Sequence, residues 1–152
     1  MRELKDIFSD TLFLGAGRGM RKDENRLWMI AEHLQEGERA LAFLSLKTSN
    51  LLLTERRLLE LKPHLDIEGM WNVLSFKGYD TRREVYLREV LGFYLESKAR
   101  GENRLRLQVG DEEVVFPIPV SETSKNPKED LEAFGDCLGR VLRPRDEWVE
   151  GG

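Results

Sequence analysis

Two neighbouring arginines, Arg56 and Arg57, are the residues best suited to hold an anionic or phosphorylated ligand. Guanidinium groups bind phosphate through paired hydrogen bonds. Lys47, a few residues earlier in a polar corner, supplies a third cation and completes the candidate ligand-binding set. The alternative, which we favour, is that the arginines pair with acids on their own or adjoining strands, such as Glu55 or Glu60.

A glycine-rich segment, Gly15-Ala16-Gly17-Arg18-Gly19, is a second place where a ligand could bind. Its third glycine comes too early for the dinucleotide fingerprint, and no Gly-Lys-Ser/Thr follows as a P-loop requires. Arg18, Arg21 and Lys22 could still hold an anion beside backbone amides. We interpret the segment as an ordinary linker instead.

The residue types that usually perform catalysis or bind metals are few and scattered. His33 and His64 have no second His or Cys at ligand spacing. Cys137 falls beside an apolar helical stripe, where a buried, reduced thiol is expected, because a nucleophile needs a neighbouring base. The acids of residues 111–113 cluster at a turn and are expected to be solvated. We therefore predict no enzyme activity, no metal site and no cofactor.

The composition excludes several classes of protein. The net charge of −4 argues against a nucleic-acid partner, which needs a surplus of cations. The first residues lack the long apolar stretch of a secretory signal, and no apolar run is long enough to span a bilayer. The 152 residues suit one domain, and we expect it to be cytoplasmic. Arg outnumbers Lys two to one and amides are few, which favours a thermophilic source.

The apolar spacing predicts helices at both ends of the chain. A short helix is expected within residues 1–14, then a loop over 15–24 and a second helix from Asp23 to Gly37. The final helix has its start signals together: Asn126 as N-cap, Pro127 at the first helical position and Glu129 in a capping box. Its Gly135 would let it lie close to a sheet. Residues 144–152 are expected to be a loose tail.

Between the helices the pattern changes to short antiparallel strands. The clearest pair is a hairpin over residues 104–118, turning at Gly110-Asp111. In that register Leu107 lies opposite Val114 and Leu105 opposite Phe116, so turn chemistry and apolar pattern agree. Residues 63–69 are expected to be a loop.

Two local patterns resemble the bacterial and archaeal pleckstrin-homology-like family. One is a Gly-Glu pair, here Gly37-Glu38, followed by the turn Leu53-Thr54-Glu55-Arg56-Arg57 between two strands. The other is the step Val85-Tyr86-Leu87-Arg88-Glu89-Val90. The segment 63–80 is longer than the family usually carries.

The resemblance implies an α+β fold: an antiparallel barrel or two-sheet sandwich of about seven strands with a C-terminal capping helix. It also implies a division into an N-terminal helical extension (1–37), a PH-like domain (38–143) and a tail (144–152). The expected function is a non-catalytic prokaryotic binding module for a protein partner or a second copy of itself. It would dock through an exposed strand edge or the segment 63–80, where Met70 and Trp71 are the interface candidates. The alternative is binding of anionic membrane lipid, or another phosphorylated ligand, through Lys47, Arg56 and Arg57.

Overall fold

The protein is described by a computed structural model that covers residues 2–46, 48–97, 102–119 and 127–151. Its helical elements are α1 (Leu4–Phe8), η1 (Arg18–Lys22), α2 (Glu24–Ala31), η2 (Leu87–Glu89) and α3 (Pro127–Gly151). Its strands are β1 (Leu12–Gly15), β2 (Ala40–Ser45), β3 (Asn50–Thr54), β4 (Arg57–Glu68), β5 (Val73–Tyr86), β6 (Val90–Ser97), β7 (Glu102–Val109) and β8 (Glu112–Pro119).

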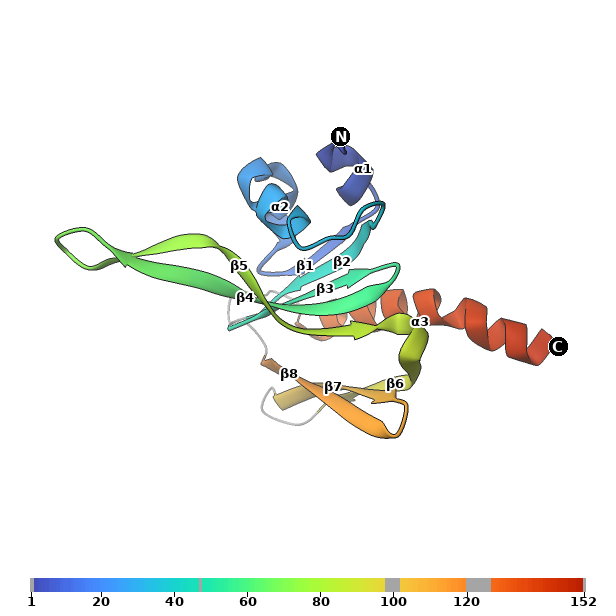
Figure 1. The fold of residues 1–152 in the computed structure, drawn as a ribbon. Coiled ribbons are helices and arrows are strands. Elements are labelled where there is room, and N and C mark those ends of the chain that lie inside the picture. Colours follow the sequence, from blue (N-terminus) through green and yellow to red (C-terminus); the bar gives the residue numbers. More distant parts are fainter. Residues whose placement is uncertain (1, 47, 98–101, 120–126, 152) are drawn as a thin grey trace.

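The strands form two sheets. The first has the order β1-β2-β3-β4-β5 and the second β6-β7-β8, and every pairing except β1 with β2 is antiparallel. Figure 1 shows the smaller sheet below the larger one, with α1 and α2 above the larger sheet and α3 on the side. The expected α+β class is therefore confirmed, in its two-sheet form rather than as a closed barrel.

The main apolar core lies between the two sheets and is completed by α3. Phe134, Leu138 and Leu142 of α3 are buried in the same cluster as Phe116 of β8 and Leu53 of β3. The expectation of a capping helix is thus confirmed. A Cβ atom on Gly135 would lie 2.6 Å from Leu95 Cδ1 of β6, so this glycine does allow the helix to approach the sheet closely.

The N-terminal region covers the other face of the larger sheet. Ile7, Leu27 and Ile30 are buried in a second cluster with Phe43 of β2 and Leu59 of β4. Sheet residues are consequently buried on both faces, and every residue of β3 is buried. Whether residues 38–143 fold without residues 1–37 stays a prediction.

The expected helix over residues 1–14 is wrong beyond Phe8. Leu12–Gly15 form β1, which pairs in parallel with β2, Phe13 opposite Phe43 and Leu14 opposite Leu44. Phe13 and Leu14 are buried in the second and the first cluster respectively, which requires the alternation of a strand. This strand is also why the chain has eight strands rather than about seven.

Other expectations about single segments are also corrected. The loop expected over residues 63–69 is largely strand, because β4 continues to Glu68. The loop over 15–24 contains η1, and α2 ends at Ala31 rather than at Gly37. The tail expected from residue 144 belongs to α3, which continues to Gly151.

The hairpin and the cap of α2 agree with the sequence. Leu105 pairs with Phe116 and Leu107 with Val114 in β7 and β8, as expected. The Asp23 side chain accepts a hydrogen bond from the backbone N–H of Arg26, as an N-cap does. None of the helices in the described part of the chain combines the length and the apolarity that crossing a membrane requires.

Candidate functional site

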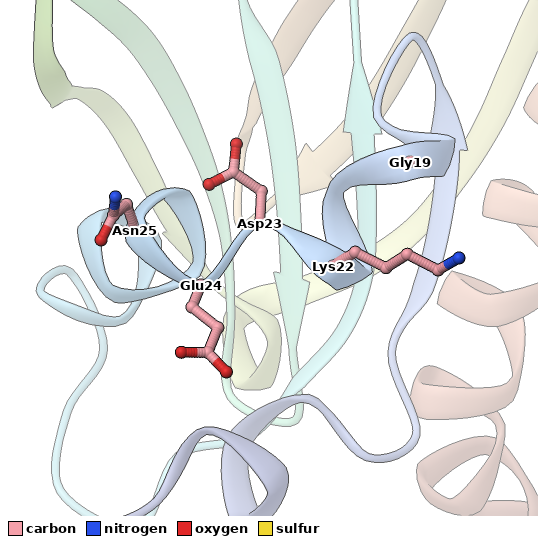
Figure 2. Close-up of a pocket in the computed structure, with 5 residues that line it drawn as sticks. All are labelled: Gly19, Lys22, Asp23, Glu24 and Asn25. Carbon is pink, nitrogen blue, oxygen red and sulfur yellow. The ribbon is translucent and has the colours of Figure 1, made fainter.

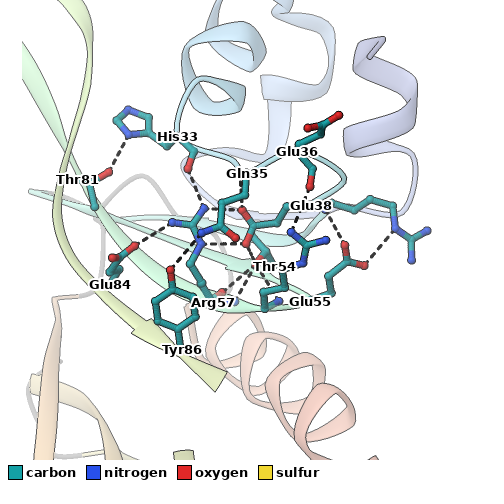
Figure 3. Close-up of polar contacts among 12 residues, drawn as sticks. His33, Gln35, Glu36, Glu38, Thr54, Glu55, Arg57, Thr81, Glu84 and Tyr86 are labelled. Carbon is teal, nitrogen blue, oxygen red and sulfur yellow. Dashed lines mark hydrogen bonds and ion pairs between the residues drawn. The ribbon is translucent and has the colours of Figure 1, made fainter. Parts of the chain in front are cut away.

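The Gly-Glu pair and the turn between β3 and β4 meet in one buried polar network. The Arg57 guanidinium donates to both carboxylate oxygens of Glu38, from Nη2 at 2.5 Å and from Nε at 3.0 Å. It also donates to Glu84 Oε2 at 2.9 Å and to the backbone oxygen of His33 at 2.9 Å. Figure 3 shows these groups converging between the N-terminal region and the sheet. Glu38 is 0% exposed and Arg57 5%, so this pair lies in the interior.

Thr54 completes the network and explains the turn sequence. Its hydroxyl donates to Glu38 Oε2 at 2.6 Å and accepts from the backbone N–H groups of Arg56 and Arg57 at 3.1 and 2.9 Å. The backbone N–H of Gln35 donates to Glu38 Oε1 at 2.9 Å. The turn motif therefore secures the connection of β3 to β4 against the segment that precedes β2.

The ionisation of this network is strongly biased. Burial alone would raise the pKa of Glu38, but hydrogen bonds from Arg57, Thr54 and Gln35 outweigh it and hold the pKa below its usual value of 4.5. The hydrogen bond to Glu38 likewise raises the pKa of Arg57. Both groups are therefore charged at neutral pH.

The structure separates the three cations of the candidate ligand-binding set. The Arg57 side chain is buried in the network, whereas that of Arg56 is exposed and donates to the backbone oxygen of Glu36 at 3.2 Å. Lys47 lies outside the described residues. Ligand binding by these residues stays a prediction, and Arg56 is the member whose described side chain faces solvent.

The acids expected to pair with these arginines have other partners. Glu55 accepts from Arg39 Nε at 3.4 Å, and Glu60 from Arg83 Nε at 3.1 Å. Arg83 also lies over the Phe116 ring at 4.2 Å, so its pair with Glu60 links the two sheets. The expectation that structural ion pairs occupy the turn is correct for Arg57, but its partners are Glu38 and Glu84.

The glycine-rich segment is a structural connection between β1 and α3. The backbone N–H of Gly15 donates to the buried Asp130 of α3 at 3.2 Å, and Arg18 pairs with the same carboxylate. Arg21 donates to the backbone oxygens of Phe8 at 3.2 Å and Thr11 at 2.5 Å. Two of the three cations that could have held an anion here therefore have partners within the protein.

Lys22, the third of these cations, borders an open hollow of about 520 Å³ together with Gly19, Asp23, Glu24 and Asn25. Figure 2 shows the four side chains pointing in different directions, and two of them are acids. They do not converge on a position that a ligand could occupy.

The histidines and the cysteine are also described. His33 Nδ1 lies 2.7 Å from Thr81 Oγ1, and burial raises the pKa of the Cys137 thiol, whose Sγ lies 3.9 Å from the Leu41 oxygen. No cluster of three potential metal ligands occurs among the described residues.

The largest exposed apolar surface lies on the outer half of the β4–β5 hairpin, which we call the arm and define as residues 62–80. Figure 1 shows it projecting well beyond the two sheets. At its tip Met70 is 89% and Trp71 84% exposed. The other exposed large apolar side chains of the arm are Leu65, Ile67, Val73 and Leu74. Both interface candidates are therefore at the end of this projection, and their role stays a prediction.

The arm has one apolar and one polar face. Leu65 pairs with Phe76 and Ile67 with Leu74, so these four side chains share a face. Asp66 and Glu68 alternate with them and point to the other face.

The polar face carries its own ion pairs. Glu68 pairs with Lys77 at 2.5 Å, and His64 lies 2.9 Å from Asp80 and 3.1 Å from Asp66. The Asp80 hydrogen bond, with the charge of Asp66, raises the pKa of His64.

Helix α2 supports the base of the arm. Arg26 lies over the Phe76 ring at 4.7 Å, and Phe76 packs edge-on against Tyr79 at 5.2 Å. Phe76 is thereby half-buried, whereas the apolar side chains beyond it are bare. Sequence analysis missed the arm because Pro63 and Gly69 suggested a loop, although the alternation of Leu65 and Ile67 with acids is a strand signal.

The chain matches no protein-family model and no curated protein. Two solved structures are similar to it. One is a pleckstrin homology domain from Shewanella amazonensis SB2B, with a TM-score of 0.50 and 12% identity over 78% of this chain and 86% of that one. The other is a DUF1696-family protein with a pleckstrin-homology domain from Shewanella loihica PV-4, with a TM-score of 0.49 and 11% identity over 79% and 92%. The first likeness shows that this chain has a pleckstrin-homology-like fold, as the sequence resemblance implied.

Proposed function

We propose that this chain, whose fold is that of a pleckstrin homology domain, is a non-catalytic binding module that docks a protein through the arm. The supporting observation is the bare apolar face and tip of the arm. Domains of this fold generally serve as binding modules. A cytoplasmic location, as predicted from the sequence, suits this role.

The physical case rests on the cost of leaving the arm uncovered. An isolated two-stranded hairpin is marginally stable in water, and the outer arm has no third strand or helix against it among the described residues. Its six exposed apolar side chains present on the order of 800 Å², well above the largest apolar patch of most monomers. Covering this surface would stabilise the arm and provide the driving force for docking.

The arm suits a protein better than an anionic membrane. Its charged side chains are Lys62 and Lys77 against the acids Asp66, Glu68 and Asp80, so acids are in excess with His64 neutral. Binding to anionic lipid relies on clustered cations near the surface. The alternative of an anionic ligand depends instead on the distant turn that carries Arg56.

The test is affinity capture from the native lysate with three forms of the protein. Met70→Ser combined with Trp71→Ser should abolish specific capture, because buried aromatic anchors dominate interface energies. Leu91→Ser is the matched control: Leu91 is 71% exposed on β6 of the smaller sheet, so its loss should leave capture unchanged. Equal capture by all three forms would reject docking through the arm.

The lipid alternative is examined in parallel by sedimentation with vesicles that contain anionic lipid, at low and physiological salt. We expect the wild-type protein to stay in the supernatant. Salt-sensitive binding that Arg56→Glu removes would favour the basic turn over the arm.

A further inference from the structure

We infer that the arm docks on the arm of a second copy of this chain, apolar face against apolar face, across a twofold axis. This inference rests on the proposed function and specifies its partner. It requires that one face of the arm be apolar over its length, that its area suit a dimer and that its charges stay in solvent.

The apolar face is continuous from the base of the arm to its tip. The cross-strand pairs Leu65–Phe76 and Ile67–Leu74 follow one another along the hairpin, and the four-residue loop with Met70 and Trp71 comes next. Successive pairs on one face are about 7 Å apart along a strand. The result is a narrow strip rather than a pocket, which fits another strip better than a globular side chain.

The area matches what a specific dimer needs. The exposed apolar side chains of one arm offer on the order of 800 Å², which is about the share that one partner contributes to a standard specific interface. Two arms in contact would therefore supply the whole interface. Twofold pairing also closes, since each copy uses the same surface and none is left exposed.

The charges of the arm favour this arrangement. The pairs Glu68–Lys77 and His64–Asp66 lie on the opposite face, so packing the apolar strips together leaves them in water. No ion pair has to be desolvated, which is the usual penalty at a charged interface. A bilayer would bring the acids of the same arm close to the lipid headgroups.

Antiparallel crossing of the two arms fixes the positions of individual residues. The tip of each arm, with Met70 and Trp71, would then lie against the base of the other near Leu65 and Phe76. The midpoint between base and tip is the pair Ile67–Leu74, which would lie beside the twofold axis. A residue at this position would approach its own equivalent in the second copy.

Sedimentation velocity of the full chain at concentrations from about 1 to 200 μM tests the inference. We expect a reversible monomer–dimer equilibrium. Met70→Ser with Trp71→Ser should raise the dimer dissociation constant by on the order of 100-fold, since central aromatic anchors carry most interface energy. The control Leu91→Ser should leave the constant unchanged. A wild-type protein that is monomeric throughout, or a dimer insensitive to the tip, overturns the inference.

Cross-linking tests the crossing geometry with a different readout. Leu74→Cys should form an intermolecular disulfide under mild oxidation, whereas Leu91→Cys should not. Wild type provides the baseline, since its one cysteine, Cys137, is buried. Equal cross-linking of both variants would overturn the placement of Leu74 at the axis.

The outcomes separate this inference from the proposed function. A monomer whose tip variant still loses specific capture from lysate rejects the second copy but keeps docking through the arm. A monomer with no tip-dependent capture rejects both. Vesicle binding that depends on Trp71 would reject both in favour of a membrane surface.

Discussion

Replacing Arg57 by methionine is expected to lower the free energy of unfolding by about 3–5 kcal/mol, because Glu38 would then be a buried charge without its main partner. The expected fall in melting temperature is about 10 °C for a chain of this size. Urea denaturation followed by circular dichroism measures the change. The matched control is Arg56→Met, whose exposed side chain should cost about 0.5 kcal/mol or less.

A double substitution separates the pair from general damage to the site. Glu38→Leu together with Arg57→Met removes both charges and should recover much of the lost stability, because a buried ion pair can often be exchanged for apolar side chains. If Arg57→Met unfolded no more easily than Arg56→Met, the network would not hold the β3–β4 turn as we describe.

The same pair predicts how stability depends on pH. The pKa of Glu38 is lowered in the folded protein, so its contribution is present above the unfolded value of about 4.5 and is lost as the pH falls through the folded pKa. The stability difference between wild type and Glu38→Gln should therefore narrow in acid below that value. A difference that stays constant from neutral to acid pH would argue against an ionised Glu38.

Replacing Gly15 by alanine is the second change with a large expected effect, about 3 kcal/mol of destabilisation. Gly15 has φ +67°, a conformation that side chains rarely adopt, and an added Cβ would collide with the backbone oxygen of Ser45 on β2. Neither the strand nor its carbonyl can move away cheaply. Thermal unfolding of the purified variant measures the loss.

Gly19 supplies the control within the same segment. No atom lies within 4 Å of a Cβ placed there, and Gly19→Ala should change stability by about 0.5 kcal/mol or less. Equal effects at the two positions would mean that the segment is a simple linker, as its sequence suggested, and not a structural bracket between β1 and α3.

The parts of the fold that the sequence predicted have local causes. The hairpin of β7 and β8 combines Gly110 at the turn with alternating apolar residues, so two neighbouring signals select one register. The last helix has its capping residues in sequence. Each of these signals lies within a few residues of the element that it specifies.

The parts that the sequence missed depend on distant partners. β1 is a strand because β2, about thirty residues later, offers it an edge, and its four residues carry little signal alone. Glu38 is the partner of Arg57 although 19 residues separate them, whereas the nearer Glu55 and Glu60 pair elsewhere. Tertiary pairing of this kind cannot be read from spacing along the chain.

The arm shows how a surface can be foreseen without its shape. Met70 and Trp71 were identified as interface candidates from their types and their place in a long insertion. That they stand at the end of an extended hairpin depends on β4 and β5 pairing beyond Lys62, past an irregularity near His64. The sequence of that region mixes Pro and Gly with strand residues, so it left the choice open.

The arm and the basic turn can be compared directly in one experiment, which addresses whether the arm carries the interaction. Sedimentation velocity is run at one matched concentration on wild type, Trp71→Ser and Arg56→Glu. Arg57 is left intact because its replacement would disturb the buried network. The account predicts association in wild type and Arg56→Glu and its loss in Trp71→Ser. Association that survives in Trp71→Ser and disappears in Arg56→Glu would contradict it.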